Sequence, residues 1–142
     1  MFRFWIIACM LVGIVADLHA QTRGVYAPPN TLMQVFEDHF PDAENISWKK
    51  DASGYEVVFF NHKLKMIARY AISEIWEHTD IEVPVDMMPA QTMDHFRKNF
   101  PGATQVKTGY HDSPEARYYK IDMVIDGKRR QLRYDDNGDF IR

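Results

Sequence analysis

The chain has 142 residues, of which 46% are hydrophobic and 26% are charged, and its formal net charge is −3. This composition is typical of a globular protein and excludes a disordered or collagen-like chain. Nucleic-acid binding requires a concentrated basic surface, which the sequence lacks, so we expect no nucleic-acid partner.

The charge is unevenly distributed along the chain. Residues 31–86 contain five Lys and Arg against eleven Asp and Glu, whereas residues 87–142 contain ten against eight. This weak charge asymmetry is compatible with a charged protein partner.

The first twenty residues have the pattern of a secretory signal peptide. Arg3 precedes an apolar run of 13 residues (4–16), and a small residue, Ala20, follows it. A membrane-spanning helix needs about 20 apolar residues, so we predict a signal peptide over residues 1–20, cleaved after Ala20. The mature chain is then periplasmic or secreted and has no membrane attachment; an uncleaved N-terminal anchor is the alternative.

The only cysteine, Cys9, lies inside this segment. The residues around it resemble a lipoprotein cleavage site, but they come too early after Arg3. The mature chain is therefore expected to have no disulfide, no thiolate metal site and no cysteine nucleophile.

An extended leader (residues 21–30) is expected to precede a short helix. Thr31 and Gln34 have the spacing of a capping box, and Met33, Phe36 and Phe40 form one apolar stripe. Pro41 ends the helix because proline disfavours the helical conformation at the residue before it. So short a helix must pack on other structure to be stable.

Four strands are expected next, over residues 45–50, 55–60, 64–70 and 75–79, followed by a linker over 81–88. Residues 64–70 alternate between apolar and polar side chains, which is typical of a half-buried strand. A two-residue turn at His62-Lys63 pairs Val57 with Ala68 and Val58 with Ile67 on opposite faces of the hairpin.

The same pattern returns in the second half of the chain. Met93, Phe96, Phe100 and Pro101 repeat the helix at an offset of 60, and Asp126-Gly127 forms a hairpin turn that requires positive φ. The strand residues repeat at an offset of 64, as Tyr134 follows Tyr70. We infer a duplication and predict an α+β fold: a tandem repeat, over residues 31–86 and 87–142 of one compact domain, of a short helix packed on a four-stranded antiparallel sheet in two layers.

The repeated residues resemble the PepSY-like family of exported bacterial proteins. The resemblance rests on Phe40-Pro41-x-Ala43 with Trp48, on Phe100-Pro101-x-Ala103 and on Tyr134-Asp135-x-x-Gly138-x-Phe140. It implies a β-lactamase-inhibitor-protein-like fold, whose sheets form a concave surface that grips protein, and a periplasmic module for protein interaction or for inhibition. The first repeat departs from the family, since residues 70–74 lack its Asp and Gly.

No residue pattern predicts catalysis or a cofactor. The segment 135–139 resembles the start of a calcium loop, but Phe140 stands where such a loop needs glycine. The five histidines beyond residue 20 lack metal-binding spacing, and no serine has a nucleophile-elbow context. We therefore expect no enzyme, no metal site and no cofactor.

The predicted function is protein binding through the face of the sheet that carries no helix. Val58, Phe60 and Ile67 are expected on that face, and an exposed apolar patch usually marks an interaction site. The competing interpretations are that the second repeat or a second copy covers them, and that the basic strand 128–133 is a solvated surface. The residues predicted to bind the partner are Val58, Phe60, Ile67, Arg69, Lys120, Arg129 and Arg133.

A small-ligand carrier is the alternative function. Its pocket would lie between helix and sheet and would be lined by Tyr55, Tyr70, Tyr119 and Tyr134.

Overall fold

The computed structural model describes residues 26–141. The predicted signal peptide, Cys9, the cleavage site at Ala20 and most of the leader therefore lie outside the described residues. Neither helix in the described part is long and apolar enough to span a membrane.

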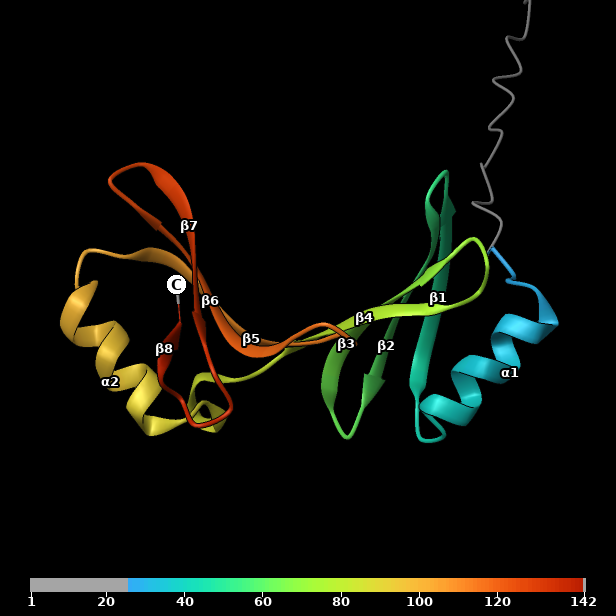
Figure 1. Ribbon diagram of the computed structural model, residues 1–142, viewed down its shortest axis with the longest axis horizontal. Coiled ribbons are helices and arrows are strands. Elements are labelled where there is room, and N and C mark those ends of the chain that lie inside the picture. Colours follow the sequence, from blue (N-terminus) through green and yellow to red (C-terminus); the bar gives the residue numbers. More distant parts are fainter. Residues whose placement is uncertain (1–25, 142) are drawn as a thin grey trace, which may run out of the picture.

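Eight strands form one antiparallel sheet in chain order, from β1 at one edge to β8 at the other (Figure 1). The two helices lie at opposite ends of the molecule, outside the sheet. The elements are α1 (Asn30–His39), β1 (Glu44–Asp51), β2 (Gly54–Asn61), β3 (Leu64–Ala71), β4 (Trp76–Glu82), a 3₁₀ turn η1 (Val85–Met87), α2 (Ala90–Asn99), β5 (Thr104–Asp112), β6 (Arg117–Ile125), β7 (Lys128–Tyr134) and β8 (Phe140–Ile141).

The predicted fold class is wrong in its central feature, because the chain does not form a tandem repeat of four-stranded sheets. Strands β4 and β5 pair antiparallel from Thr79–Asp112 to Glu82–Gly109, which makes one continuous sheet of eight strands. The prediction ended β4 at Thr79, yet the strand continues to Glu82. The extra length exposes backbone donors and acceptors at an edge, and β5 pairs with them.

Helix α1 packs on the β1–β4 half of the sheet. Leu32 and Phe36 are buried in one core with Val57, Phe59 and Tyr70. The predicted stripe was partly wrong, because Leu32 is fully buried whereas Met33 is 37% exposed. The predicted capping box is also wrong: the helix begins after Pro29 without a side-chain cap, and the Gln34 side chain donates to Asp38 instead.

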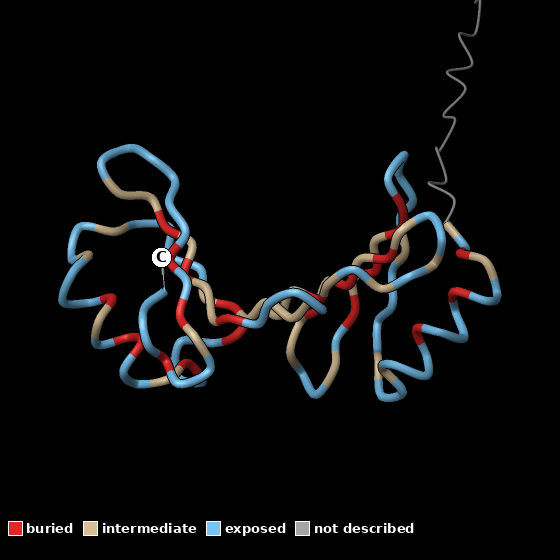
Figure 2. The backbone as a smooth tube through the Cα atoms, viewed as in Figure 1, coloured by how far each residue is buried: buried red, intermediate tan, exposed pale blue. Residues whose placement is uncertain are grey.

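Helix α2 packs on the β5–β8 half in the same way. Met93 and Phe96 are buried with Ile121, Leu132 and Tyr134 in a second core. Buried segments alternate with exposed ones along the central strands (Figure 2), since successive side chains of a strand point to opposite faces.

The hairpin registers confirm the predicted pairings. Val57 pairs with Ala68 and Val58 with Ile67 across β2 and β3, and Ile121 pairs with Leu132 across β6 and β7. The turn residues His62, Lys63 and Asp126 all have positive φ, as two-residue hairpin turns of type I′ require.

Candidate protein-binding face

The strand registers define which side chains share the face without helices. Val57 and Ile121 face the helices. Because successive side chains of a strand point to opposite faces, the residues directly before and after them face away, and so does every second residue from there. The helix-free face consists of Ser47, Lys49 and Asp51 of β1; Glu56, Val58 and Phe60 of β2; Lys65, Ile67 and Arg69 of β3; His78, Asp80 and Glu82 of β4; Lys107, Gly109 and His111 of β5; Tyr118, Lys120, Asp122 and Val124 of β6; and Arg129, Gln131 and Arg133 of β7.

All seven residues predicted to bind a partner belong to this face. They do not form one patch, however: Val58, Phe60, Ile67 and Arg69 lie on β2 and β3, whereas Lys120, Arg129 and Arg133 lie on β6 and β7. Strands β4 and β5 separate the two groups.

The apolar group is partly accessible. Phe60 is 37% exposed, while Val58 and Ile67 are half-buried. Phe60 also lines a shallow groove of about 630 Å³, whose other apolar wall includes the exposed Val85 and Val106. Lys65 and Glu82 also line the groove, with Lys65 Nζ 2.8 Å from Glu82 Oε1, and so do Lys63 and Lys107. The groove thus combines apolar side chains with one charged pair and two further lysines.

Arg69 is held by its own chain. Its guanidinium donates to both carboxylate oxygens of Asp51, at 2.8 and 3.0 Å, and to the hydroxyl of Ser53. The hydrogen bond from Arg69, followed by those from Ser53, holds the pKa of Asp51 well below its usual range. Arg69 therefore fixes the β1–β2 turn rather than presenting a free charge.

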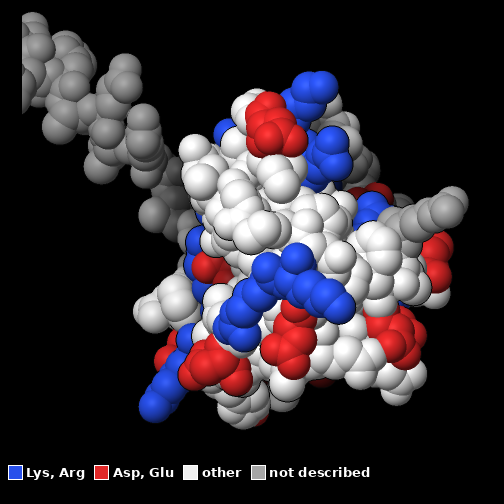
Figure 3. Space-filling view, turned by 90° about the vertical axis from the view of Figure 1, so that its left-hand side faces the viewer, with Lys and Arg blue, Asp and Glu red and all other residues white. Residues whose placement is uncertain are grey.

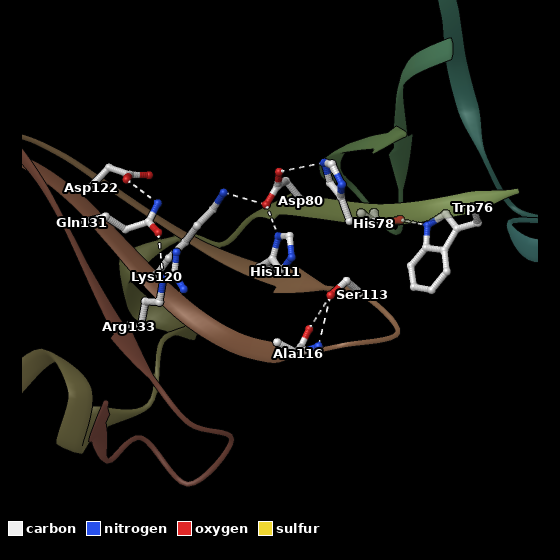
Figure 4. A network of polar contacts seen from close by, with 11 residues as sticks. Trp76, His78, Asp80, His111, Ser113, Ala116, Lys120, Asp122, Gln131 and Arg133 are labelled. Carbon is white, nitrogen blue, oxygen red and sulfur yellow. Dashed lines mark hydrogen bonds and ion pairs between the residues drawn. The ribbon is translucent and has the colours of Figure 1, made fainter. Parts of the chain in front are cut away.

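The centre of the face carries a polar cluster on β4, β5 and β6 (Figure 4). Lys120 Nζ and His111 Nδ1 lie 2.6 and 3.0 Å from Asp80 Oδ1, and His78 Nε2 lies 3.8 Å from Asp80 Oδ2. The two imidazole rings are 5.3 Å apart. Three basic side chains thus surround one carboxylate; we call His78, Asp80, His111 and Lys120 the central cluster.

Asp80 is ionised more readily than a free aspartate. Its partial burial opposes ionisation, but the hydrogen bonds from Lys120 and His111 outweigh this effect, so the pKa of Asp80 is lowered.

Tyr118 extends the central cluster toward β7. His111 stacks on its ring at 4.8 Å between centroids, and the Arg133 guanidinium lies 4.6 Å from the ring centroid. Tyr118 is 9% exposed although no helix covers it. The Arg133 guanidinium thus makes a cation–π contact with Tyr118.

The central cluster was not predicted from the sequence, although Lys120 was among the residues expected to bind a partner. The alternation of His78, Asp80 and Glu82 with Thr79, Ile81 and Val83 was a signal for a longer β4. The prediction instead ended the strand at Thr79 and placed a linker over residues 81–88. The approach of His111 to Asp80 depends on the β4–β5 pairing, which no local pattern predicted.

The four tyrosines of the predicted carrier pocket do not meet. Tyr55 and Tyr70 belong to the first core, and Tyr134 and Tyr119 to the second. Burial raises the pKa of Tyr70 and that of Tyr134 to about 12. Of the four, Tyr119 alone lines a groove between the two cores, a shallow space of about 430 Å³ at Ile81 and Tyr110.

The segment that resembles a calcium loop forms a turn. The Asp135 carboxylate accepts hydrogen bonds from the amides of Asn137 and Asp139, each at 2.9 Å, and Gly138 has φ of 86°. Residues 26–141 contain no group of three or more His, Cys, Asp or Glu side chains arranged to bind a metal.

Comparison with known proteins relates the chain to solved structures only. No protein-family model matches, and no curated protein matches. A BLIP-like (β-lactamase-inhibitor-protein-like) protein of Bacteroides fragilis is 16% identical with a TM-score of 0.70, over 82% of this chain and 86% of that one. A DUF2874-family protein of Bacteroides ovatus is 18% identical with a TM-score of 0.69, over the same shares.

A third similar structure is described as a putative periplasmic protein of Bacteroides eggerthii. It is 17% identical with a TM-score of 0.68, over 82% of this chain and 88% of that one. At these identities the likeness concerns the fold. The chain has a BLIP-like fold, which confirms that part of the predicted fold class.

Proposed function

We propose that this chain is an exported, non-catalytic protein that binds a protein partner through the helix-free face of its sheet. The observation that carries the proposal is the partly exposed apolar group, Val58, Phe60 and Ile67, on a face that neither helix covers. Exposed apolar patches on soluble proteins commonly serve as interaction sites.

Export to the periplasm, with cleavage after Ala20, is part of the proposal. It rests on the apolar run of residues 4–16 and gains support from the periplasmic description of one protein with a similar fold. Two further expectations stay predictions: that the chain belongs to the PepSY-like family, and that its sequence contains an internal repeat.

A non-catalytic role fits the polar contacts of the face. In the described part of the chain, no serine hydroxyl is hydrogen-bonded to a histidine: Ser53 bonds with Asp51 and Arg69, and Ser113 with Ala116. In the central cluster, Lys120 and His111 both contact the Asp80 carboxylate, so these charged groups are engaged in pairs within the chain.

The test compares substitutions at two residues that are equally exposed but lie on different surfaces of the molecule. Phe60 and Met33 are both 37% exposed, Phe60 on the helix-free face and Met33 on α1. Phe60→Asp should remove the cross-linked partner that the wild-type chain captures in its native cells, and Met33→Asp should retain it. Ile67→Asp provides a second variant on the face.

Thermal unfolding separates a lost interface from a lost fold. We expect Phe60→Asp to unfold within a few degrees of the wild type. If both Asp variants of the face retain the partner, or if the partner is lost only when the fold collapses, the helix-free face does not bind it.

The small-ligand carrier stays the alternative, without the pocket that was predicted for it. Its tyrosines lie in two separate cores. Native mass spectrometry of the protein purified from its host tests it, since a carrier should retain a ligand.

A further inference from the structure

We infer that the partner of the helix-free face carries acidic side chains next to an apolar one, with the acidic side chains bound by the β5–β7 half of the face. The inference rests on the proposed function and names the partner's chemistry. It follows from the way charge and apolar surface are divided between the two halves.

Both cations that β2 and β3 place on the helix-free face are paired within the chain, and Lys49 of the edge strand β1 is the cross-strand neighbour of Glu56. Lys65 bonds Glu82 at 2.8 Å, and Arg69 bonds Asp51 at 2.8 Å. What this half offers a partner is therefore the apolar group of Val58, Phe60 and Ile67, of which Phe60 is the most exposed.

The β5–β7 half has cations without such partners. Lys107, Arg129 and Arg133 are exposed, and within residues 26–141 none of them has a carboxylate oxygen within 4 Å, in contrast to Lys120 beside Asp80. The single acidic side chain of this half, Asp122, accepts a hydrogen bond from Gln131. Its charge is not enough to balance three cations.

Two of these cations, Lys107 and Arg129, line a shallow groove of about 460 Å³ at β5, β6 and β7, whereas Arg133 is not among its lining residues. Asp122 and Val124 line it from the same face of the sheet. The groove thus combines cationic side chains with an apolar one. A carboxylate there would gain two charged hydrogen-bond donors.

Charge complementarity decides the class of partner. An unpaired basic half beside an apolar half fits a protein segment with Asp or Glu next to Phe, Leu or Met. A nucleic acid would use the cations but would leave Phe60, Val58 and Ile67 without a match, and the net charge of −3 opposes it.

The outer surface of the α2 end provides a contrast. There Lys and Arg side chains lie among Asp and Glu side chains (Figure 3), and Arg97 lies 4.0 Å from Asp94. Arg97 and Lys98 are exposed on this surface, so they serve as matched controls for charge reversal.

The test uses a display library of random twelve-residue peptides, selected on the chain that starts at Gln21. We expect enriched peptides with Asp or Glu next to Phe, Leu or Met.

The most enriched peptide is then synthesised, and its affinity for each variant is measured by fluorescence anisotropy. The double variant Lys107→Glu/Arg129→Glu should bind it about tenfold more weakly, Arg97→Glu/Lys98→Glu should bind it within about twofold of the wild type, and added salt should weaken wild-type binding.

Each other outcome overturns the inference. Enriched peptides that lose affinity with Phe60→Asp but not with Lys107→Glu/Arg129→Glu would refute the acidic partner and leave the proposed function standing. Enrichment of basic or uncharged peptides would do the same. No enrichment, or peptides insensitive to Phe60→Asp as well, would count against both, and tighter binding of a single-stranded oligonucleotide would reassign the cations to nucleic acid.

Discussion

Two buried tyrosines show how the surroundings of a hydroxyl group decide what it contributes to the stability of the fold. Tyr70 and Tyr134 are both fully buried, each in one of the two cores. The Tyr134 hydroxyl shares a hydrogen bond of 3.0 Å with His95 Nδ1, whereas the buried Tyr70 hydroxyl has no hydrogen-bond partner among the described residues. A buried hydroxyl without a partner costs free energy that a hydrogen-bonded one does not.

Removal of the two hydroxyls should therefore have opposite effects. We expect Tyr134→Phe to lower the free energy of unfolding by about 1 kcal/mol, and Tyr70→Phe to leave it unchanged or raise it by up to about 1 kcal/mol. Urea denaturation of both variants and the wild type measures the difference. An equal loss in both variants would show that the Tyr70 hydroxyl is hydrogen-bonded after all.

At the level of elements, α1 is attached to the sheet through a narrow stripe. Phe36 packs edge-on against Phe59, with ring centroids 5.0 Å apart, and Leu32 lies one turn before it. The next residue, Met33, turns toward solvent. The stripe follows the positions i and i+4 that share a helix face.

Alanine substitution at these neighbouring positions tests the stripe. Leu32→Ala should destabilise the chain by about 2 to 5 kcal/mol, because it leaves a cavity in the first core. Met33→Ala should change the stability by less than about 1 kcal/mol. Equal losses in chemical denaturation would show that the helix packs through a different face.

For the whole molecule, the junction between the halves is the short β4–β5 ladder. It joins only four residue pairs, against eight between β2 and β3. The central cluster lies on this ladder, and Lys120 of β6 reaches across β5 to Asp80 of β4. The cluster therefore adds side-chain contacts between the two half-sheets at this short ladder.

This placement makes the junction sensitive to acid. Since the folded-state pKa of Asp80 is lowered, its ionised form contributes stability above the unfolded-state pKa, about 3.9. That contribution is lost as the pH falls through the folded-state pKa. Asp80→Asn should therefore be less stable than the wild type at neutral pH, and the gap should narrow under acid.

Denaturation curves of the wild type and Asp80→Asn at a series of pH values measure this gap. Asp94→Asn on α2, where Asp94 is 81% exposed, serves as the control. A gap that does not change with pH would mean that Asp80 acts through its shape rather than its charge.

The sequence by itself determined the local structure: the two helices ending before proline, the β2–β3 and β6–β7 registers, and the face on which Val58, Ile67 and Arg133 lie. These features depend on periodicity and turn chemistry, which act between neighbours in the chain. Asn45 and Gln105 both adopt positive φ next to irregular strand pairing. Periodicity and turn chemistry did not predict this backbone conformation.

Only the tertiary structure decided that the eight strands form one sheet and that His78, Asp80, His111 and Lys120 meet at its centre. Both depend on which strand edges pair. Edge pairing satisfies the backbone N–H and C=O groups of segments that lie far apart in the sequence, so no local pattern predicts it. For the same reason, tertiary structure decided that Arg69 is occupied by Asp51 while Arg129 and Arg133 remain exposed.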